Sequence, residues 1–600
     1  MAVPWRSPSW LSTVVVVVFV AMVSVSGLWR GADGRAWKDT IRSDAKGYYS
    51  YLTSIFLRGD PGHEPDAWEY IQHTPTGTLN KYFCGTAIAM APWFAVGHGL
   101  ALLDPEAPRD GYSEYEMKAI SIGGWVYLWL GLIALRALLL RMGVREAVVV
   151  WIILGLGLGT PLVQYTAIQP GWSHVYSFCA ITTFLLLVHH LSTGAALRWL
   201  VVAAALLGLI ILIRPVNGLV LLAVPVVAGA DTLALLARAV ERWWMLLLAL
   251  VAGVAVLAVQ PLLWHVQTGN WFEWGYRNEG FYWDRPMVRE VLFGIRRGLF
   301  VWSPVLLPAA AAAFLLWRKA PVRSAFSLLY WTANTYVISC WWIWYYGSGF
   351  ASRVYIDHYP VLVIPLALVL QHAGRGWWHA ARWWMALCIV LHLFQYAQYR
   401  KGILHHEHMD AEKYAWAWGR MADADAGRLG GRMEEAPYHP HGMDVVITES
   451  TDLERPTHYW AHGDIRRHPH AFSRERVCVY NAHNEFGVTF TAPPGSIPLG
   501  RELFLQVGMQ RYEAKAGDAA GALAITTVVR PDGSSSFYNS FRIDPVPGTT
   551  DRTWRALEFA IPVPALKQGE ELIFYLWNQH RTSRFLIDDV MMRVSAVRPE

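Results

Sequence analysis

The sequence predicts a multi-pass α-helical membrane domain of about 11 spans, followed by a C-terminal all-β sandwich or jelly roll. The 600-residue chain is 54% hydrophobic and only 16% charged, whereas about a quarter of the residues in a soluble protein are charged. Apolar runs long enough to cross a hydrocarbon core recur from Leu11 to about Gln398 and then stop. Short alternating segments separated by turn residues follow, which is typical of a β-sandwich.

The overall composition narrows the classes of function. The formal net charge of +5 is too mild to indicate a nucleic-acid partner. The five cysteines show no paired spacing, so no disulfide scaffold is expected. The chain carries no Walker loop, dinucleotide fingerprint or nucleophile elbow, and no cytoplasmic loop is large enough to be a catalytic domain. An ATP-driven pump and a soluble sugar-nucleotide enzyme are therefore disfavoured.

The membrane domain is predicted over residues 1–400. Its first apolar run, 11–29, ends near Leu28-Trp29-Arg30-Gly31 without a small-residue cleavage site, so it is expected to remain as an anchor. The other expected spans are about 119–140, 147–166, 174–191, 198–213, 216–230, 244–263, 299–317, 325–344, 354–372 and 381–398.

The short connections between these spans alternate in charge, which predicts the orientation of the chain. The basic set is Arg141 and Arg145; Arg198; Arg238 and Arg242; Arg318, Lys319 and Arg323; and Arg375 and Arg382. These connections are expected to face the cytoplasm by the positive-inside rule. The segments 169–174, 214–217, 265–298 and 346–353 then face outward. The N-terminus is expected in the cytoplasm and the C-terminal domain outside it, in a bacterial inner or plasma membrane.

The apolar stretch 83–103 does not fit this alternation as a crossing helix. Because 11–29 exits and 119–140 must re-enter, 83–103 is expected to lie against the outer membrane face, within a long first outer loop at 30–118. The competing topology lets 83–103 cross and inverts every later loop.

The soluble part begins with a polar, His-rich linker at 401–440. His405-His406-Glu407-His408 has a spacing that could bind a metal, but a solvated linker is favoured because no second ligand pair stands at a fixed spacing. Residues 441–600 are predicted to form the extracytoplasmic β-sandwich. Its expected strands are Val477–Tyr480, Gly487–Thr491, Leu503–Met509, Leu523–Val529, Phe537–Ile543, Ala556–Ile561, Glu571–Trp577 and Phe585–Val597.

The outward segments hold most of the unusual polar residues, beginning with Asp44 just beyond the first span. A carboxylate beside the membrane surface could deprotonate a hydroxyl, or it could be an ordinary solvated loop residue. Outward arginines run against the local charge rule and could clamp a phosphate or pair with nearby carboxylates. The substrate-binding candidates are Lys81, Tyr82, His174, Arg277, Glu279, Arg296, Arg297, Arg353, Asp357 and His358.

Four segments, in order, carry a resemblance to a known family. They are Ser43-Asp44-Ala45-Lys46-Gly47-Tyr48-Tyr49; Lys81-Tyr82-Phe83-Cys84-Gly85 through Trp93-Phe94; Arg296-Arg297-Gly298-Leu299-Phe300 through Ser303-Pro304; and Tyr346-Gly347 through Ser352-Arg353 to Tyr359-Pro360. With the long first outer loop, the chain resembles the polytopic GT-C glycosyltransferases over roughly residues 10–400. The last strands, around Leu572–Asn578 and Phe585–Val590, resemble a jelly roll of the carbohydrate-binding-module type.

The resemblance implies transfer of a sugar from a polyprenyl-phosphate carrier to an acceptor hydroxyl at the extracytoplasmic face, with inversion. It implies that Asp44 is the catalytic base and that Arg353, or else Lys81, contacts the carrier phosphate. Many members have Asp-Gly where this chain has Asp44-Ala45. No cofactor is certain, and a divalent metal is not supported, because no added acidic motif occurs at 169–174.

The partners implied are the polyprenyl-phosphate-linked sugar donor, a glycan, lipid or protein acceptor, and membrane lipids, with no nucleic acid. Two other classes stay open. The chain could be a lipid or sugar transporter or flippase, which often carries internal repeats. It could also be a glycan-binding surface-assembly protein without catalysis, whose membrane part serves only as an anchor.

Overall fold

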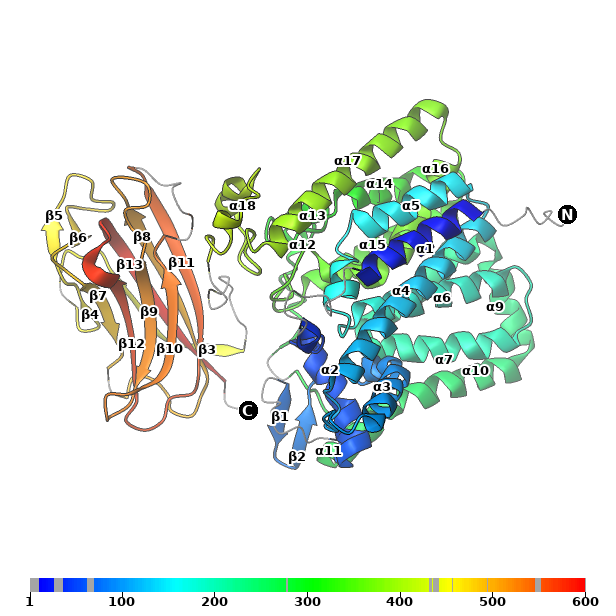
Figure 1. Ribbon diagram of the computed structural model, residues 1–600, viewed down its shortest axis with the longest axis horizontal. Coiled ribbons are helices and arrows are strands. Elements are labelled where there is room, and N and C mark those ends of the chain that lie inside the picture. The colour runs from blue at the N-terminus through cyan, green and yellow to red at the C-terminus, as the bar shows by residue number, and fades with distance from the viewer. Residues whose placement is uncertain are drawn as a thin grey trace. The chain divides into compact units, whose positions relative to one another are not determined.

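The computed structural model divides into two compact units (Figure 1). Unit 1 comprises Met1–Tyr346 and Phe350–Phe394, and unit 2 comprises Gly347–Gly349 and Gln395–Glu600. The structure describes residues 10–25, 36–61, 70–276, 279–430, 434, 442–455, 457–493, 495–544, 546 and 552–598. Unit 1 is largely helical and unit 2 is rich in strands, so the predicted combination of a helical N-terminal region and a β-rich C-terminal domain is confirmed.

Unit 1 is built from a succession of apolar helices. They are α1 (Trp10–Val25), α4 (Glu114–Arg141), α5 (Glu146–Leu158), α6 (His174–Ser192), α7 (Arg198–Ile213), η5 (Pro215–Ala223), α8 (Val224–Ala228), α9 (Thr232–Glu241), α10 (Trp243–Leu257), α11 (Val259–Thr268), α12 (Val288–Phe293), α13 (Leu299–Trp302), α14 (Leu307–Leu315), α15 (Pro321–Ser339), η8 (Arg353–His358) and α16 (Tyr359–Gln371); α17 (Arg375–Arg400) continues into unit 2. Six helical stretches among the described residues are long and apolar enough to cross a membrane, and four shorter helices are also apolar. The predicted number of about 11 spans stays a prediction.

The exposed faces of these helices suit a lipid environment. An 18-residue window within Trp243–Thr268 has a mean hydropathy of 2.5, yet only 11% of that window is buried inside the protein. Leu246, Leu247 and Leu250 on α10 are all exposed. A soluble protein rarely exposes so continuous an apolar face, whereas a helix in a bilayer satisfies its backbone internally and turns such side chains to lipid. Unit 1 is an integral membrane domain.

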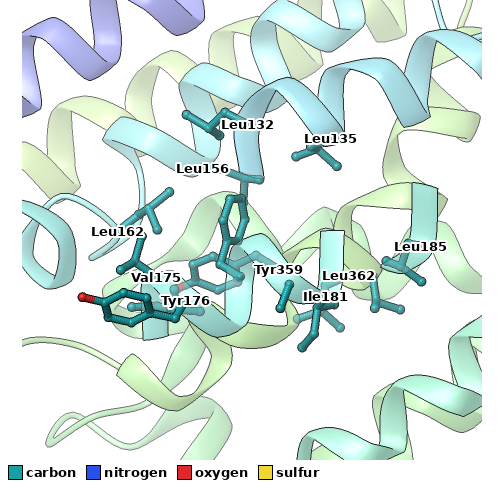
Figure 2. Packing of buried hydrophobic residues seen from close by; sticks show 14 of the residues in the cluster. Leu132, Leu135, Leu156, Leu162, Val175, Tyr176, Ile181, Leu185, Tyr359 and Leu362 are labelled. Carbon is teal, nitrogen blue, oxygen red and sulfur yellow. The ribbon is translucent and has the colours of Figure 1, made fainter. Parts of the chain in front are cut away.

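The core of unit 1 joins four of these helices (Figure 2). Leu132 and Leu135 of α4, Leu156 of α5, Ile181 of α6 and Leu362 of α16 belong to one buried cluster. Small residues allow the close approach: a Cβ on Gly131 would lie 2.8 Å from the Phe178 ring, so glycine lets α4 and α6 touch. This packing fixes the relative positions of the ends of α6 and α16, where candidate site residues lie.

Between α1 and α4 lie α2 (Asp44–Thr53), the hairpin β1 (Ile71–Thr74) and β2 (Gly77–Asn80), and α3 (Gly85–Leu103). Helix α3 packs along the N-terminal half of α4, where the Tyr127 hydroxyl donates to the carbonyl of Ala89 at 2.8 Å and Gly97 lies against Glu116. By length and composition α3 could itself cross a membrane. The expectation that 83–103 lies on the outer face stays a prediction.

Unit 2 contains α18 (Ala411–Ala417) and two antiparallel sheets. One sheet has the order β10-β9-β12-β7-β4 and the other β11-β8-β13-β6-β5, with β3 also paired to β13. The bounds are β3 (Met443–Thr451), β4 (Trp460–Ala461), β5 (Ile465–Arg467), β6 (Arg476–Tyr480), β7 (Phe486–Thr491), β8 (Leu503–Tyr512), β9 (Ala522–Val529), β10 (Ser535–Arg542), β11 (Trp554–Val563), β12 (Glu571–Asn578) and β13 (Phe585–Val597).

The alternation of buried and partly exposed side chains along the strands explains how the two sheets form one core. In β12, Leu572, Phe574 and Leu576 are buried while Tyr575 and Trp577 are only partly covered. The buried set joins residues of both sheets in one apolar cluster. Side chains of a strand point alternately to its two faces, so the opposite face of β12 is left with its aromatic residues outward.

Candidate functional site

The polar side chains of unit 1 gather where several helices begin or end. The contributing segments are the start of α2, the turn before α3, the start of α6, the junction of α7 with η5, the loop after α11 and the loop before α16. The segments 169–174, 214–217, 265–298 and 346–353, which the charge alternation predicts on one side of the membrane, all contribute. The following contacts describe the cluster.

Asp44 is the first residue of α2, where a negative charge is favoured by the helix dipole. Its Oδ1 accepts a hydrogen bond from the Tyr82 hydroxyl at 3.0 Å. Its Oδ2 lies 3.3 Å from Nη2 of Arg353, a residue 309 positions away in the chain. The Asp44 side chain keeps 27% of its surface exposed, so the carboxylate is held by two partners and is still reachable.

The surroundings of Asp44 favour its charged form. Burial alone would raise the pKa of the carboxyl group, but the Arg353 guanidinium, the Tyr82 hydroxyl and the Lys81 ammonium outweigh it. Together they hold the pKa of Asp44 below its ordinary value. Asp44 is therefore a carboxylate at neutral pH and can accept a proton.

Arg353 is oriented by three different contacts. Besides facing Asp44, its Nη2 donates to the carbonyl of Tyr346 at 2.6 Å. Its guanidinium lies over the Trp172 ring, 4.0 Å from the centroid, which is a favourable cation–π distance. The Nη1 group is buried and has no hydrogen-bond partner. A buried guanidinium nitrogen without an acceptor is costly, so Nη1 is a candidate donor to an anionic group.

A second charged group is centred on Asp357, which is fully buried. The carboxylate accepts from His174 Nδ1 at 2.7 Å and from Asn217 Nδ2 at 3.1 Å, and Nη1 of Arg214 lies 3.7 Å away. A buried carboxylate is stable only when it is paired and hydrogen-bonded. Asp357 thereby fixes the positions of His174 and Arg214 at the ends of α6 and α7.

Lys81 and Glu279 form a third pair at the edge of the cluster, with Nζ and Oε1 3.0 Å apart. The Lys81 ammonium also lies 5.4 Å from the centroid of Tyr82 and 6.0 Å from that of Tyr276. Tyr48 packs edge-on against Tyr82 at 4.8 Å. The cluster is thus a set of charges enclosed by tyrosine rings.

Most of the predicted candidates meet in this cluster, namely Asp44, Lys81, Tyr82, His174, Glu279, Arg353 and Asp357. His358 accompanies Asp357 in the chain, and the hydroxyl of Tyr330 lies 2.7 Å from its Nδ1. Arg296 lies over the rings of Tyr345 and Trp344, and Arg297 is buried. Arg277 lies outside the described residues.

Six residues of the cluster were absent from the predicted set: Tyr48, Trp172, Arg214, Asn217, Tyr276 and Tyr346. Arg214 and Asn217 stood in a predicted outward segment, at a proline that interrupts two apolar runs, so a signal for them existed. Tyr48 and Tyr346 stood in segments that carry the resemblance, but their residue type singled out neither, because a membrane protein uses tyrosines throughout its interface belts. Among the described residues, no group of three or more His, Cys, Asp or Glu side chains is arranged to hold a metal ion.

No protein-family model and no curated protein matches the chain. Among solved structures, the chain is similar to the arabinosyltransferase EmbB from Mycobacterium smegmatis, at 13% identity and a TM-score of 0.34, over 99% of this chain and 65% of that one. It is also similar to the archaeal oligosaccharyltransferase AglB from Archaeoglobus fulgidus in complex with an inhibitory peptide and a dolichol-phosphate, at 13% identity and a TM-score of 0.36, over 68% of this chain and 54% of that one.

A third similar structure is the CBM22-1 xylan-binding domain of Xyn10C from Paenibacillus barcinonensis, at 18% identity and a TM-score of 0.19, over 26% of this chain and 98% of that one. The chain spans about two thirds of the length of EmbB and about half that of AglB. These neighbours are two sugar-transferring enzymes and a xylan-binding domain, the kinds of protein that the sequence resembles. At TM-scores below 0.5 the likeness assigns no activity and no site residue to this chain.

Proposed function

We propose that this chain is a membrane glycosyltransferase that moves a sugar from a polyprenyl-phosphate carrier to an acceptor hydroxyl at the extracytoplasmic face. One observation carries the proposal: the exposed edge of an ionised Asp44 adjoins Arg353, whose Nη1 is buried without an acceptor. A base for a hydroxyl and a vacant donor for a phosphate therefore stand side by side. Inverting transfer from a lipid phosphate needs both.

In the proposed reaction Asp44 accepts the proton of the acceptor hydroxyl as that oxygen attacks the anomeric carbon. A new C–O bond forms on one face of the sugar while the bond to the phosphate oxygen breaks on the other. The electron pair of that bond leaves with the lipid phosphate, and the anomeric configuration inverts. Asp44 releases its proton to solvent after the glycosylated product departs.

Arg353 has two roles in this scheme. Its planar guanidinium is suited to hold two phosphate oxygens, and it stabilises the charge that grows on the leaving group. A phosphate that shares the guanidinium also weakens its pairing with Asp44. Because that pairing lowers the pKa of Asp44, donor binding would raise it and make the carboxylate a better base once the sugar is in place.

Arg214 is proposed to supply a second positive charge to the phosphate. Its side chain keeps 21% of its surface exposed while Asp357 holds it from the buried side. His174 and Asn217 complete the hydrogen bonds of Asp357, so they act as positioning residues. Lys81 is paired with Glu279 at the edge of the cluster. It is proposed as the alternative contact to the carrier phosphate.

Unit 2 favours a glycan as the acceptor over a lipid or a protein. Phe486 is 54% exposed, and its ring is nearly parallel to that of Trp577 at 6.5 Å. Tyr575 lies in the same outward face of β12, and Tyr538 of β10 is also exposed. Exposed aromatic faces arranged along a sheet offer stacking surfaces for sugar rings. We propose that this face binds the acceptor chain.

The test is transfer by the purified full-length chain in lipid nanodiscs, with a panel of polyprenyl-monophosphate sugars and membrane glycans. Asp44→Asn keeps the shape of the side chain and removes the base, so transfer should fall about a hundredfold or more. Asp39→Asn is the matched control, since Asp39 is an exposed aspartate paired with Arg42. If Asp44→Asn kept near-normal turnover, the assignment of the base would be wrong.

The same preparation separates the two alternatives. A flippase or transporter would move a labelled polyprenyl-phosphate sugar across a sealed liposome without any transfer, and Asp44→Asn would leave that movement unchanged. A non-catalytic assembly protein would bind glycan through unit 2 and would give no product with any donor of the panel.

A further inference from the structure

Aromatic rings continue outward from the Asp44 cluster in one unbroken series. Tyr82, which donates to Asp44, packs edge-on against Tyr276 at 6.0 Å, and Tyr276 packs in the same way against Trp341 at 5.6 Å. Trp341 contacts Phe281 at 5.0 Å, and Phe281 stacks on Trp283 at 4.9 Å. The series ends where Trp283 stacks on Tyr336 of α15 at 5.9 Å. We call these six residues the aromatic track.

The burial of the rings changes along the track. Tyr276, Phe281 and Trp341 are half-buried, whereas Trp283 is 52% exposed and Tyr336 is 39% exposed. The track therefore begins inside the charged cluster and ends at the surface of unit 1. Its last ring belongs to α15, on which Leu329 is also exposed, so the track ends at an exposed face of this helix.

The backbone holds the track in place without using these rings. Phe281 and Trp341 form a β-bridge, and the N–H of Trp342 donates to the carbonyl of Gly280 at 2.9 Å. The N–H of Tyr282 donates to the carbonyl of Cys340 at 2.6 Å, and the N–H of Met287 donates to that of Ser339 at 3.0 Å. The loop after α11 is thus fastened to the end of α15 by main-chain contacts that a change of the Trp283 side chain would leave intact.

We propose that the aromatic track binds the isoprenoid chain of the donor and leads its phosphate to Arg353. The proposal rests on the function proposed above. A polyprenyl chain is long, apolar and regularly unsaturated, and aromatic faces offer it large contact area without hydrogen-bonding demands. Beside the third ring of the track, Tyr346 stacks on Trp341 at 6.2 Å and also offers its carbonyl to Arg353. The track therefore reaches the residue that the phosphate would contact.

The apolar stretch 83–103 takes no part in this route, because the ring series runs through the loop after α11 to α15. Two exposed aromatic residues at the end of α11 and the start of that loop provide a contrast. Trp271 is 60% exposed and stacks on His265 at 4.3 Å, and no ring contact joins this pair to the aromatic track among the residues that the structure describes.

The experiment compares two lipid monophosphates that share the phosphate and differ in chain length. Binding of decaprenyl phosphate and of geranyl phosphate is measured on the full-length chain in detergent. Three ring-to-ring steps of 6.2, 5.0 and 4.9 Å lead from Tyr346 beside Arg353 to Trp283, so the ten-carbon chain is expected to end before Trp283 and the longer chain to contact it. Trp283→Ala is expected to weaken binding of decaprenyl phosphate about tenfold, as for loss of one aromatic contact. Binding of geranyl phosphate should be unchanged.

Trp271→Ala is the matched control and should leave both lipids unaffected. Arg353→Ala should weaken both alike, because both carry the phosphate. If Trp283→Ala weakened the two lipids equally, or left decaprenyl phosphate unaffected, the aromatic track would be only loop packing and the inference would be wrong. If neither lipid bound the unaltered chain, the proposed function itself would fail.

Discussion

Replacing Tyr82 by phenylalanine isolates the contribution of one hydrogen bond to the charge state of Asp44. The substitution keeps the ring and its packing on Tyr48 and Tyr276, and it removes only the hydroxyl that donates to Asp44 at 3.0 Å. A hydrogen bond to a charged group contributes about 1.5–3 kcal/mol, and 1.36 kcal/mol corresponds to one pKa unit. Because 27% of the Asp44 side chain is exposed, the lower end applies and the pKa should rise by about one unit.

The expected change in the pH profile follows from the direction in which the folded protein already shifts the pKa of Asp44. The pKa of Asp44 is lowered in the folded protein, so the carboxylate is fully ionised at neutral pH both with and without the Tyr82 hydroxyl. The transfer rate at pH 7 should therefore fall less than about tenfold. The acid limb of the kcat/KM profile should move upward by about one pH unit.

The assay is sugar transfer from the active polyprenyl-phosphate donor, measured between pH 3 and pH 8 on purified chain in nanodiscs. Tyr115→Phe is the control, because the Tyr115 hydroxyl also donates to an aspartate, Asp104, at 3.0 Å, away from the cluster. An acid limb that stays in place while the neutral-pH rate collapses would refute this account of Tyr82 and would assign it a direct role in substrate binding.

Three further outcomes are expected. A Cβ on Gly47 would lie 2.1 Å from the Tyr82 ring, so Gly47→Ala should displace that ring and shift the acid limb as Tyr82→Phe does, with a larger loss of rate. Asp357→Asn removes the charge that pairs with His174 and Arg214 and should lower the free energy of unfolding by about 3–5 kcal/mol, read as a lower Tm in detergent. In unit 2, burial raises the pKa of Asp544 to about 6; stability should fall as pH rises from about 4 to about 6, and Asp544→Asn should raise the Tm at pH 7.5 but not at pH 4.

The sequence was informative about which segments meet and uninformative about the pairs within them. Charge alternation predicts that 169–174, 214–217 and 346–353 share one side of the membrane, and these segments do contribute to one cluster. It does not predict that Arg353 pairs with Asp44, which is 309 positions away in the chain, when Asp357 is only four positions away. That choice depends on how the start of α2 packs near the start of η8, which carries Arg353.

Local chemistry explains the remaining differences. The predicted span 147–166 is interrupted in the structure, where α5 ends at Leu158, because Gly159 and Pro161 follow it. In unit 2 the predicted strands correspond to β6 through β13, which alternate over several residues. The strands β4 and β5 are only two and three residues long, too short to show a period, and the apolar residues of β3 stand together at 445–447 instead of alternating.

The pairing of Asp44 with Arg353 has a consequence for the end of a catalytic cycle. In the proposed reaction the donor is a phosphodiester with one negative charge, whereas the spent carrier is a monoester that carries between one and two charges near neutral pH, since its second pKa is about 6. Arg353 and Arg214 would then hold the spent lipid more tightly than the donor. Departure of the spent carrier would limit the rate of turnover. The return of Arg353 to the Asp44 carboxylate would assist that departure. A rapid first turnover followed by a slower steady state would be its kinetic signature.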